Sequence, residues 1–189
     1  MSAPSQPERN ATVPTAPLRS APSERPNAAD SELLAFAQGA ELAVHDLYTK
    51  AVDSGRFTGD ELTMLEQFAA HHLAYAQSIN GLIGKDATNQ RNEGVYAAYA
   101  SQMSTGPSAY RALQALENTL VATHTDILSN LENHDAAVLV ASIITVEARH
   151  AAVFGVLPNL NLASALDNTA SSIAPASSAA ATTETTVAP

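Results

Sequence analysis

The sequence predicts an all-α protein, a four-helix bundle made of two helical hairpins joined by a long crossover and flanked by disordered tails. Three observations favour this fold class. Apolar residues recur three and four positions apart in several long stretches, which is the periodicity of helices with one buried face. None of the 189 residues falls in an alternating pattern typical of strands. Hydrophobic residues make up 46% of the chain and aromatic residues only 5%, which suits closely packed helices.

The first hairpin is expected to join helices over residues 31–53 and 60–80. Asp30 precedes the first apolar stripe and is a residue type that caps helix N-termini. Asp60 and Glu61 open the second helix, where negative charge favours the positive end of the helix dipole. The short turn between these ranges makes the two helices antiparallel neighbours.

A long crossover and a second hairpin follow. Residues 84–107 are polar and contain glycines, with a short helical piece expected around 95–99. This connection is too long for a tight turn and long enough to cross the length of a bundle. The third helix is expected over 107–131, and the fourth over 136–156, after a turn with a capping aspartate and before Pro158.

Composition divides the chain into three parts. Six of the ten prolines lie in the first 26 residues, so residues 1–29 are expected to be a disordered, Pro-rich arm. Residues 30–158 are expected to form the bundle. Residues 159–189 are rich in Ala, Ser and Thr and are expected to be a low-complexity tail, in which leucines near the start could extend a short helical turn.

Charge and composition exclude several functions. The formal net charge is −10 and no basic stripe is visible, which argues against nucleic-acid binding. The absence of cysteine excludes disulfides, sulfur-ligated metals and cysteine nucleophiles. No apolar run predicts a membrane span, and the N-terminus lacks the apolar segment of a signal peptide. A cytoplasmic location is therefore expected, although the Thr/Ala-rich end resembles envelope-protein linkers and leaves an envelope association open.

Five ionisable residues interrupt the apolar stripes and are expected to converge in the bundle core. A helical rise of about 1.5 Å per residue places each of them roughly 17–21 Å from the turn of its own hairpin, which is near mid-bundle. Carboxylates and imidazoles at one depth suit iron or manganese, with zinc as a further option. The candidate metal ligands are Glu41, His72, Glu117, Glu147 and His150.

At these residues the chain resembles the ferritin-like superfamily, and within it the actinobacterial ferritin-like domain proteins. The resemblance covers about 31–157 and rests on four segments: Ala40–Ala43, Phe68–His72, Leu116–Glu117 and Ile144–Ala151. The family motif is Glu on the first helix, Glu-x-x-His on the second, Glu on the third and Glu-x-x-His on the fourth. The resemblance therefore implies metal-ligand roles for the same five residues.

One motif position departs from the family. Ala69 stands three residues before His72, where the motif has a glutamate, so a full di-iron site lacks one carboxylate. His45 lies one turn after Glu41 on the same face, and the hypothesis is that His45 completes the site.

The other histidines and two tyrosines receive structural interpretations. His71 is expected to flank the site or to support a ligand, and His134 to be solvated in the turn. His124 shares the stripe of the third-helix glutamate but lies about 10 Å further along the axis, so it is expected to be a core histidine. Tyr48 and Tyr75 are near the site, where ordinary packing is the favoured interpretation.

Two functions remain open at this point. The first is a ferritin-like metal-binding protein with a carboxylate–histidine site for iron, active in iron handling or as a slow oxidase or ferroxidase with a degenerate di-metal site. The second is a non-catalytic ferritin-like scaffold, without a metal, that serves as a structural or interaction subunit of a larger complex. A homodimer is expected in preference to a cage, with the tails available to a protein partner.

Overall fold

The computed structural model describes residues 24–104, 107–157 and 162–173. Within these ranges the chain is helical and contains no strand. The elements in chain order are α1 (Ala28–Asp53), α2 (Gly59–Ile83), α3 (Glu93–Tyr99), α4 (Pro107–Asn130), α5 (His134–Val156) and α6 (Leu162–Leu166), with short 3₁₀ turns at Gly84–Asp86 and Ala100–Gln102. The predicted all-α bundle is confirmed.

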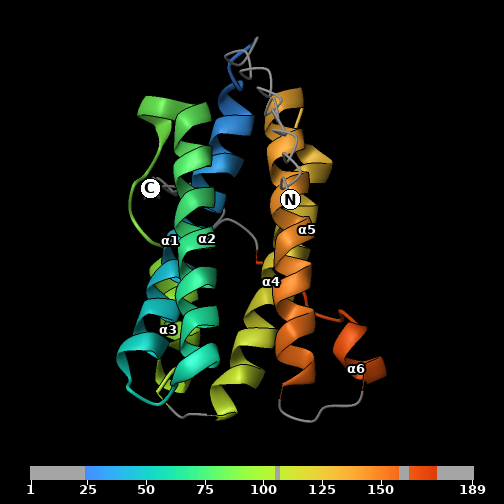
Figure 1. The fold of residues 1–189 in the computed structure, drawn as a ribbon. Coiled ribbons are helices and arrows are strands. Elements are labelled where there is room, and N and C mark those ends of the chain that lie inside the picture. The colour runs from blue at the N-terminus through green and yellow to red at the C-terminus, as the bar shows by residue number, and fades with distance from the viewer. Residues whose placement is uncertain (1–23, 105–106, 158–161, 174–189) are drawn as a thin grey trace, which may run out of the picture.

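The four long helices form two antiparallel hairpins, α1 with α2 and α4 with α5 (Figure 1). Helix α1 runs down in the view of Figure 1 and α2 returns to the top. The segment that contains α3 then descends beside the first hairpin, so that α4 starts at the bottom and runs parallel to α2. The expected crossover is therefore present, and it packs along α1.

The start of α1 differs from the predicted one because Asn27, not Asp30, is the cap. The Asn27 side chain accepts a hydrogen bond from the backbone N–H of Asp30 at 2.8 Å. Asp30 is buried inside the first turn, where its carboxylate accepts the N–H groups of Glu132 and Asn133 at 3.0 and 2.8 Å. Asp30 thus ties the start of α1 to the turn between α4 and α5.

Asn133 caps α5, where the sequence favoured Asp135. The Asn133 side chain accepts the N–H of Ala136 at 2.9 Å, so that α5 begins two positions before the expected residue 136. Asparagine and aspartate are equally good caps, which is why composition alone could not separate the two positions.

The crossover is fixed to α1 by polar contacts. The amide of Gln38 pairs with Asn89, donating to its side chain and accepting its backbone N–H, both at 3.1 Å. The N–H of Asn92 donates to the carbonyl of Gly39 at 2.7 Å. A Cβ at Gly39 would lie 3.3 Å from the carbonyl of Gln90, so this close approach favours glycine.

The core consists of two apolar clusters separated by a buried polar layer. The upper cluster, at the end where α1 begins, is built around Leu34, Ile79, Ile127 and Ile143. The lower cluster contains Tyr48 among many apolar residues of all four long helices. The polar layer between them has the depth predicted from the sequence for the candidate ligands.

Part of the C-terminal segment packs against the second hairpin. Ala165 of α6 is buried against Gly155 of α5, where an added Cβ would lie 2.5 Å from the Ala165 Cβ. Further along, the N–H of Ile173 donates to Thr123 Oγ1 of α4 at 2.9 Å. The segment predicted as a low-complexity tail therefore includes residues that contact the bundle. The arm predicted to be disordered over 1–29 overlaps the structure at 24–29, where Asn27 caps α1 and the helix begins at Ala28. Residues 1–23 and 174–189 fall outside the described residues.

Helix α5 is the one described helix that is long and apolar enough to span a membrane by length and composition alone. It also carries Glu147 and His150, both buried inside the bundle, as in the core helix of a helical domain.

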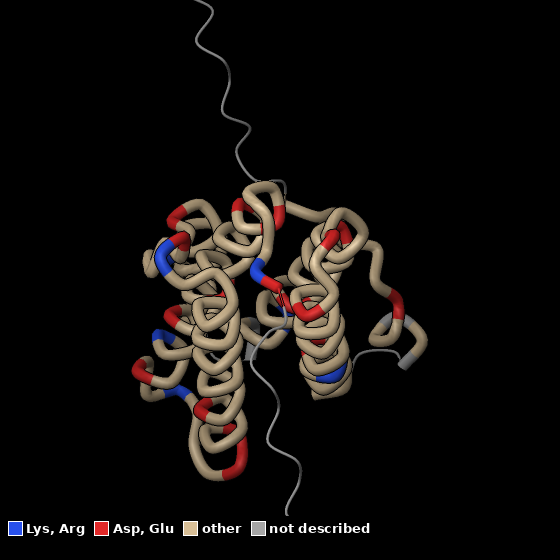
Figure 2. Tube along the Cα trace, turned by 90° about the horizontal axis from the view of Figure 1, so that it is seen from above, with Lys and Arg blue, Asp and Glu red and all other residues tan. Residues whose placement is uncertain are grey.

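Acidic residues outnumber basic ones over the tube in Figure 2, in keeping with the formal net charge of −10.

Candidate metal centre

Six ionisable side chains from all four long helices meet in the polar layer. Each of them is 2% exposed or less. Glutamate and histidine are rarely buried to this degree unless they are paired or bind a metal. The six residues are Glu41 of α1, His72 of α2, Glu117 and His124 of α4, and Glu147 and His150 of α5. They are called the core cluster below.

His72 lies at the centre of the core cluster and uses both ring nitrogens. Its Nδ1 is 2.7 Å from Glu41 Oε2, and its Nε2 is 3.1 Å from Glu117 Oε1. The imidazole therefore bridges one carboxylate of each hairpin. Tyr48 stacks on the His72 ring with centroids 5.2 Å apart, and its hydroxyl donates a hydrogen bond to Glu117 Oε1.

The alternation of carboxylate and imidazole continues on both sides of His72. On one side, His124 Nε2 lies 3.4 Å from Glu41 Oε1, and its Nδ1 lies 3.0 Å from Glu147 Oε2. On the other side, His150 Nδ1 lies 3.4 Å from Glu117 Oε1. The six side chains thus form one continuous chain of contacts through the bundle.

Several lone-pair atoms of the core cluster lack a hydrogen-bond partner among the described residues. The two contacts of 3.4 Å do not have the alignment of hydrogen bonds, so the atoms at their imidazole ends remain unpartnered. A buried polar atom without a partner costs free energy, and so many at one point fit a site that receives cations. The unpartnered atoms are Glu41 Oε1, Glu117 Oε2, His124 Nε2, Glu147 Oε1 and His150 Nδ1.

Ligand atoms of the core cluster fall into two groups that could each hold a metal ion. One group is His72, Glu117 and His150, and the other is Glu41, His72 and Glu147; within each group the ligand atoms lie within 4.8 Å of one another. His72 is common to both groups. The geometry is compatible with one or two cations held by mixed oxygen and nitrogen ligands.

The two central histidines are stabilised in their charged form. Burial disfavours an imidazolium, but the carboxylates of Glu117 and Glu41 outweigh burial and raise the pKa of His72 well above 6.5. In the same way Glu147 overcomes the effect of burial and raises the pKa of His124 to about 9. Protons on these two rings offset carboxylate charge in the metal-free protein.

The two glutamates of the second hairpin differ in their protonation. Burial alone would raise the pKa of Glu117, but His72 and His150 lower it to about 2, so this side chain is a carboxylate. Burial raises the pKa of Glu147 above its usual 4.5, although His124 acts in the opposite direction. A cation near Glu147 would remove this cost of ionisation.

The structure brings together all five residues that the sequence singled out, and it leaves His45 outside. His45 is half-buried, and its Nδ1 lies 2.9 Å from the carbonyl oxygen of Ala69, which ties the ring to the backbone of α2. Neither group of candidate ligand atoms includes His45, and neither includes His124. The structure therefore gives no support to the hypothesis that His45 replaces the missing carboxylate at Ala69.

His124 joins the core cluster, although counting residues along the helices had placed it at a different height from the candidate ligands. Side chains lean toward the N-terminus of their helix. Because α4 and α5 are antiparallel, the side chains of His124 and Glu147 lean in opposite directions along the bundle axis. His124 Nδ1 thus lies 3.0 Å from Glu147 Oε2, although helical rise places the two residues about 10 Å apart along the axis. The available signal was the seven-residue spacing from Glu117, which places His124 on the same stripe.

The remaining histidines and tyrosines lie around the core cluster. His71 is half-buried and its Nδ1 lies 3.1 Å from His150 Nε2, as expected for a residue that supports a ligand. Burial and then the neighbouring imidazoles of His150 and His72 lower the pKa of His71. Tyr75 is half-buried beside His72, and His134 is exposed at the start of α5.

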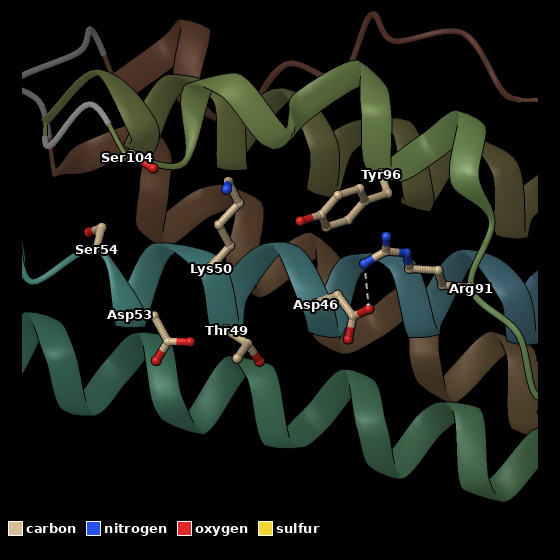
Figure 3. Close-up of a pocket in the computed structure, with 8 residues that line it drawn as sticks. All are labelled: Asp46, Thr49, Lys50, Asp53, Ser54, Arg91, Tyr96 and Ser104. Atoms are coloured by element: carbon tan, nitrogen blue, oxygen red, sulfur yellow. Dashed lines mark hydrogen bonds and ion pairs between the residues drawn. The ribbon is translucent and has the colours of Figure 1, made fainter.

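A surface groove between α1 and the crossover is separate from the core cluster (Figure 3). Its volume is about 430 Å³. In Figure 3, Lys50 reaches across the groove and Arg91 lies beside Tyr96, with its guanidinium paired to Asp46 at 2.9 Å. The lining carries charges of both signs and does not select one ligand class, so the core cluster is the stronger candidate site.

Comparison with known proteins supports the same centre. A family model described as a ferritin-like domain matches residues 29–159, which include every member of the core cluster. No curated protein and no solved structure matches the chain.

Proposed function

Given that the chain belongs to the ferritin-like domain family, we propose that its core cluster binds transition-metal ions, with iron as the physiological one. The observation that carries the proposal is the set of unpartnered carboxylate and imidazole atoms in a buried layer. Their mixture of oxygen and nitrogen ligands suits iron, manganese or zinc, and iron would supply one-electron chemistry with O2 or peroxide.

The residues of the core cluster have distinct roles in this proposal. Glu41, Glu117 and Glu147 neutralise the cations, and His150 is a terminal nitrogen ligand. His72 belongs to both groups, and as a neutral imidazole it offers the lone pair of one ring nitrogen at a time, so both groups depend on it. Tyr48 holds Glu117 in place through its hydroxyl. Because Ala69 takes the place of a family carboxylate, we propose slow oxidation or iron handling and not rapid turnover.

Metal loading tests this function directly. We expect the chelator-treated protein to retain one to two Fe²⁺ ions per chain after anaerobic loading and desalting, measured by elemental analysis, since there are two ligand groups. His72→Ala should lose most of this iron, whereas His134→Ala, at an exposed histidine, should bind like the wild type. Wild-type protein that retains no iron, manganese or zinc would contradict the proposal.

A non-catalytic scaffold is the second candidate function. It is favoured by Ala69 and by the charge balance of the metal-free cluster, in which protonated His72 and His124 offset two carboxylates. A scaffold would unfold at the same temperature with and without metal and would co-purify with a stoichiometric partner.

The assembly and location of the protein remain part of the proposal. We propose a homodimer, with the tails available to a protein partner, in the cytoplasm. Light scattering after size-exclusion chromatography distinguishes a dimer from a cage.

A further inference from the structure

His150 differs from the other histidines of the core cluster in what its two nitrogens face. His72 and His124 each lie between two carboxylates. His150 instead has Glu117 on its Nδ1 side and the imidazole of His71 on its Nε2 side, at 3.1 Å. The two rings are nearly parallel, at 6°, with centroids 5.3 Å apart.

The inward nitrogen of His150 is the one available to a cation. His150 Nδ1 is buried and has no hydrogen-bond partner, because Glu117 Oε1, at 3.4 Å, is not aligned with it. A histidine can offer the lone pair of Nδ1 only when its ring proton is on Nε2. That proton needs an acceptor on the outer side of the ring, and the acceptor at that position is His71 Nδ1.

Phe68 restricts the remaining freedom of the His150 ring. Its ring stacks on His150 with centroids 3.8 Å apart and an angle of 21°, and it lies 6.1 Å from the His71 ring. The face of His150 is therefore held by Phe68, and its outer edge by His71. His71 is itself half-buried and belongs to neither group of ligand atoms.

We infer that His71 is a positioning residue: its Nδ1 accepts the Nε2–H of His150 and thereby turns the lone pair of His150 Nδ1 into the core cluster. The inference rests on the proposed function, since it assigns His150 Nδ1 as a metal-binding atom. Metal-bound histidines in proteins usually donate their second N–H to an acceptor that fixes their orientation. The usual carboxylate acceptor increases the basicity of the ligand, whereas a neutral imidazole leaves His150 a neutral, weaker donor.

Two variants of His71 separate positioning from packing. His71→Ala removes the acceptor, and His71→Asn keeps an amide oxygen close to the position of Nδ1. Loss of such a supporting hydrogen bond costs about 10–100-fold in metal affinity in other proteins. With Co²⁺ as the probe, we therefore expect His71→Ala to bind about 10–100-fold more weakly and with a changed visible spectrum. His71→Asn and the exposed control His134→Ala should bind like the wild type.

A readout without metal keeps this inference separate from the proposed function. Nitrogen-15 NMR of the metal-free protein should show that His150 carries its proton on Nε2 in the wild type and in His71→Asn. In His71→Ala the proton should distribute over both nitrogens, while thermal unfolding reports whether each variant is folded. A proton fixed on Nδ1 of His150 in the wild type, or equal Co²⁺ binding in wild type and His71→Ala, would overturn the inference. Wild-type protein that binds no Co²⁺ but shows the expected proton position would contradict only the proposed function.

Discussion

His124 Nδ1 lies 3.0 Å from Glu147 Oε2, although the two residues are offset by about 10 Å along their antiparallel helices. The contact brings a third imidazole into a layer where the family motif supplies only two. We propose that His124 partly compensates for the carboxylate that is missing at Ala69, because its unpartnered Nε2 lies 3.4 Å from Glu41 Oε1, although neither group of candidate ligand atoms includes it.

Replacement of His124 tests this compensation. We expect His124→Gln to lower the metal content by up to one ion per chain, because Glu41 and Glu147 lose the imidazole between them. His45→Gln should leave the metal content unchanged, since His45 is tied to the Ala69 carbonyl. Elemental analysis after iron loading measures both; a loss confined to His45→Gln would restore the interpretation made from the sequence.

Ala69→Glu should restore the family carboxylate and lower the stability of the metal-free protein. The new side chain would lie three residues before His72 on the same face, in a position that is 7% exposed. An uncompensated buried charge costs about 3–5 kcal/mol, so the chelated variant should be less stable by that order. Bound iron should restore this stability, and Fe²⁺ should be oxidised faster in the variant than in the wild type. Ala70→Glu, at an exposed position, is the control and should change neither property.

The stability of the metal-free protein should fall as the pH rises above neutrality. The raised pKa values of His72 and His124 contribute stability that is complete below pH 6.5 and is lost as the pH rises, for His124 through about 9. The raised pKa of Glu147 acts in the same direction, because its ionisation opposes folding above its usual 4.5. Glu117, with its pKa lowered to about 2, contributes stability that is complete above its usual 4.5 and is lost as the pH falls toward 2.

Thermal unfolding of the chelated protein between pH 6 and 9 measures this effect. Bound metal replaces the protons on the core cluster, so the stabilisation by metal should increase over the same range. A metal-free protein whose unfolding temperature rises steadily from pH 6 to 9 would contradict the assigned protonation states.

Tyr48→Phe should destabilise the metal-free protein by about 1–3 kcal/mol, since a hydrogen bond to a charged group is lost in the core. The ring would remain stacked on His72, so packing is conserved. Tyr75→Phe is the matched control, because the described contacts of Tyr75 are ring contacts. Urea unfolding compares the two, and equal stabilities would show that the hydroxyl of Tyr48 contributes nothing.

Gly155→Ala and Gly81→Ala should change stability in opposite directions. A Cβ at Gly155 would lie 2.5 Å from the Ala165 Cβ, so α6 would have to move, at a cost of about 1–3 kcal/mol. Gly81 has no atom within 4 Å of an added Cβ, so alanine should stabilise α2 by about 0.5–1 kcal/mol. Limited proteolysis should cut the segment around α6 faster in Gly155→Ala only; equal cleavage would mean that α6 does not depend on this contact.

The sequence was sufficient for the helices and for five members of the core cluster, because both depend on local periodicity. The apolar stripes define the long helices to within a few residues, and equal counts from each hairpin turn place Glu41 opposite His72. Helix ends were less certain, since Asn27 and Asp30 are equally good caps and only the contact of Asp30 with a distant turn decides between them.

The sixth member could not be found in this way. Counting by helical rise compares the heights of backbone atoms, whereas His124 and Glu147 meet through side chains that lean in opposite directions. The role of His45 stays a prediction; its Nδ1 lies 2.9 Å from the carbonyl oxygen of Ala69, a backbone contact that a pattern of side chains does not show.

The polar layer between the two apolar clusters also determines how far each helix is shifted along its neighbours. Stripes rich in alanine would otherwise allow one helix to slide along another by a turn, about 5.4 Å, with little loss of packing. Such a slide would set glutamates against leucine or isoleucine and leave histidines without their acceptors. The residues proposed to hold the metal therefore also fix the register in which the helices pack. A substitution among them would disturb helix alignment as well as metal binding.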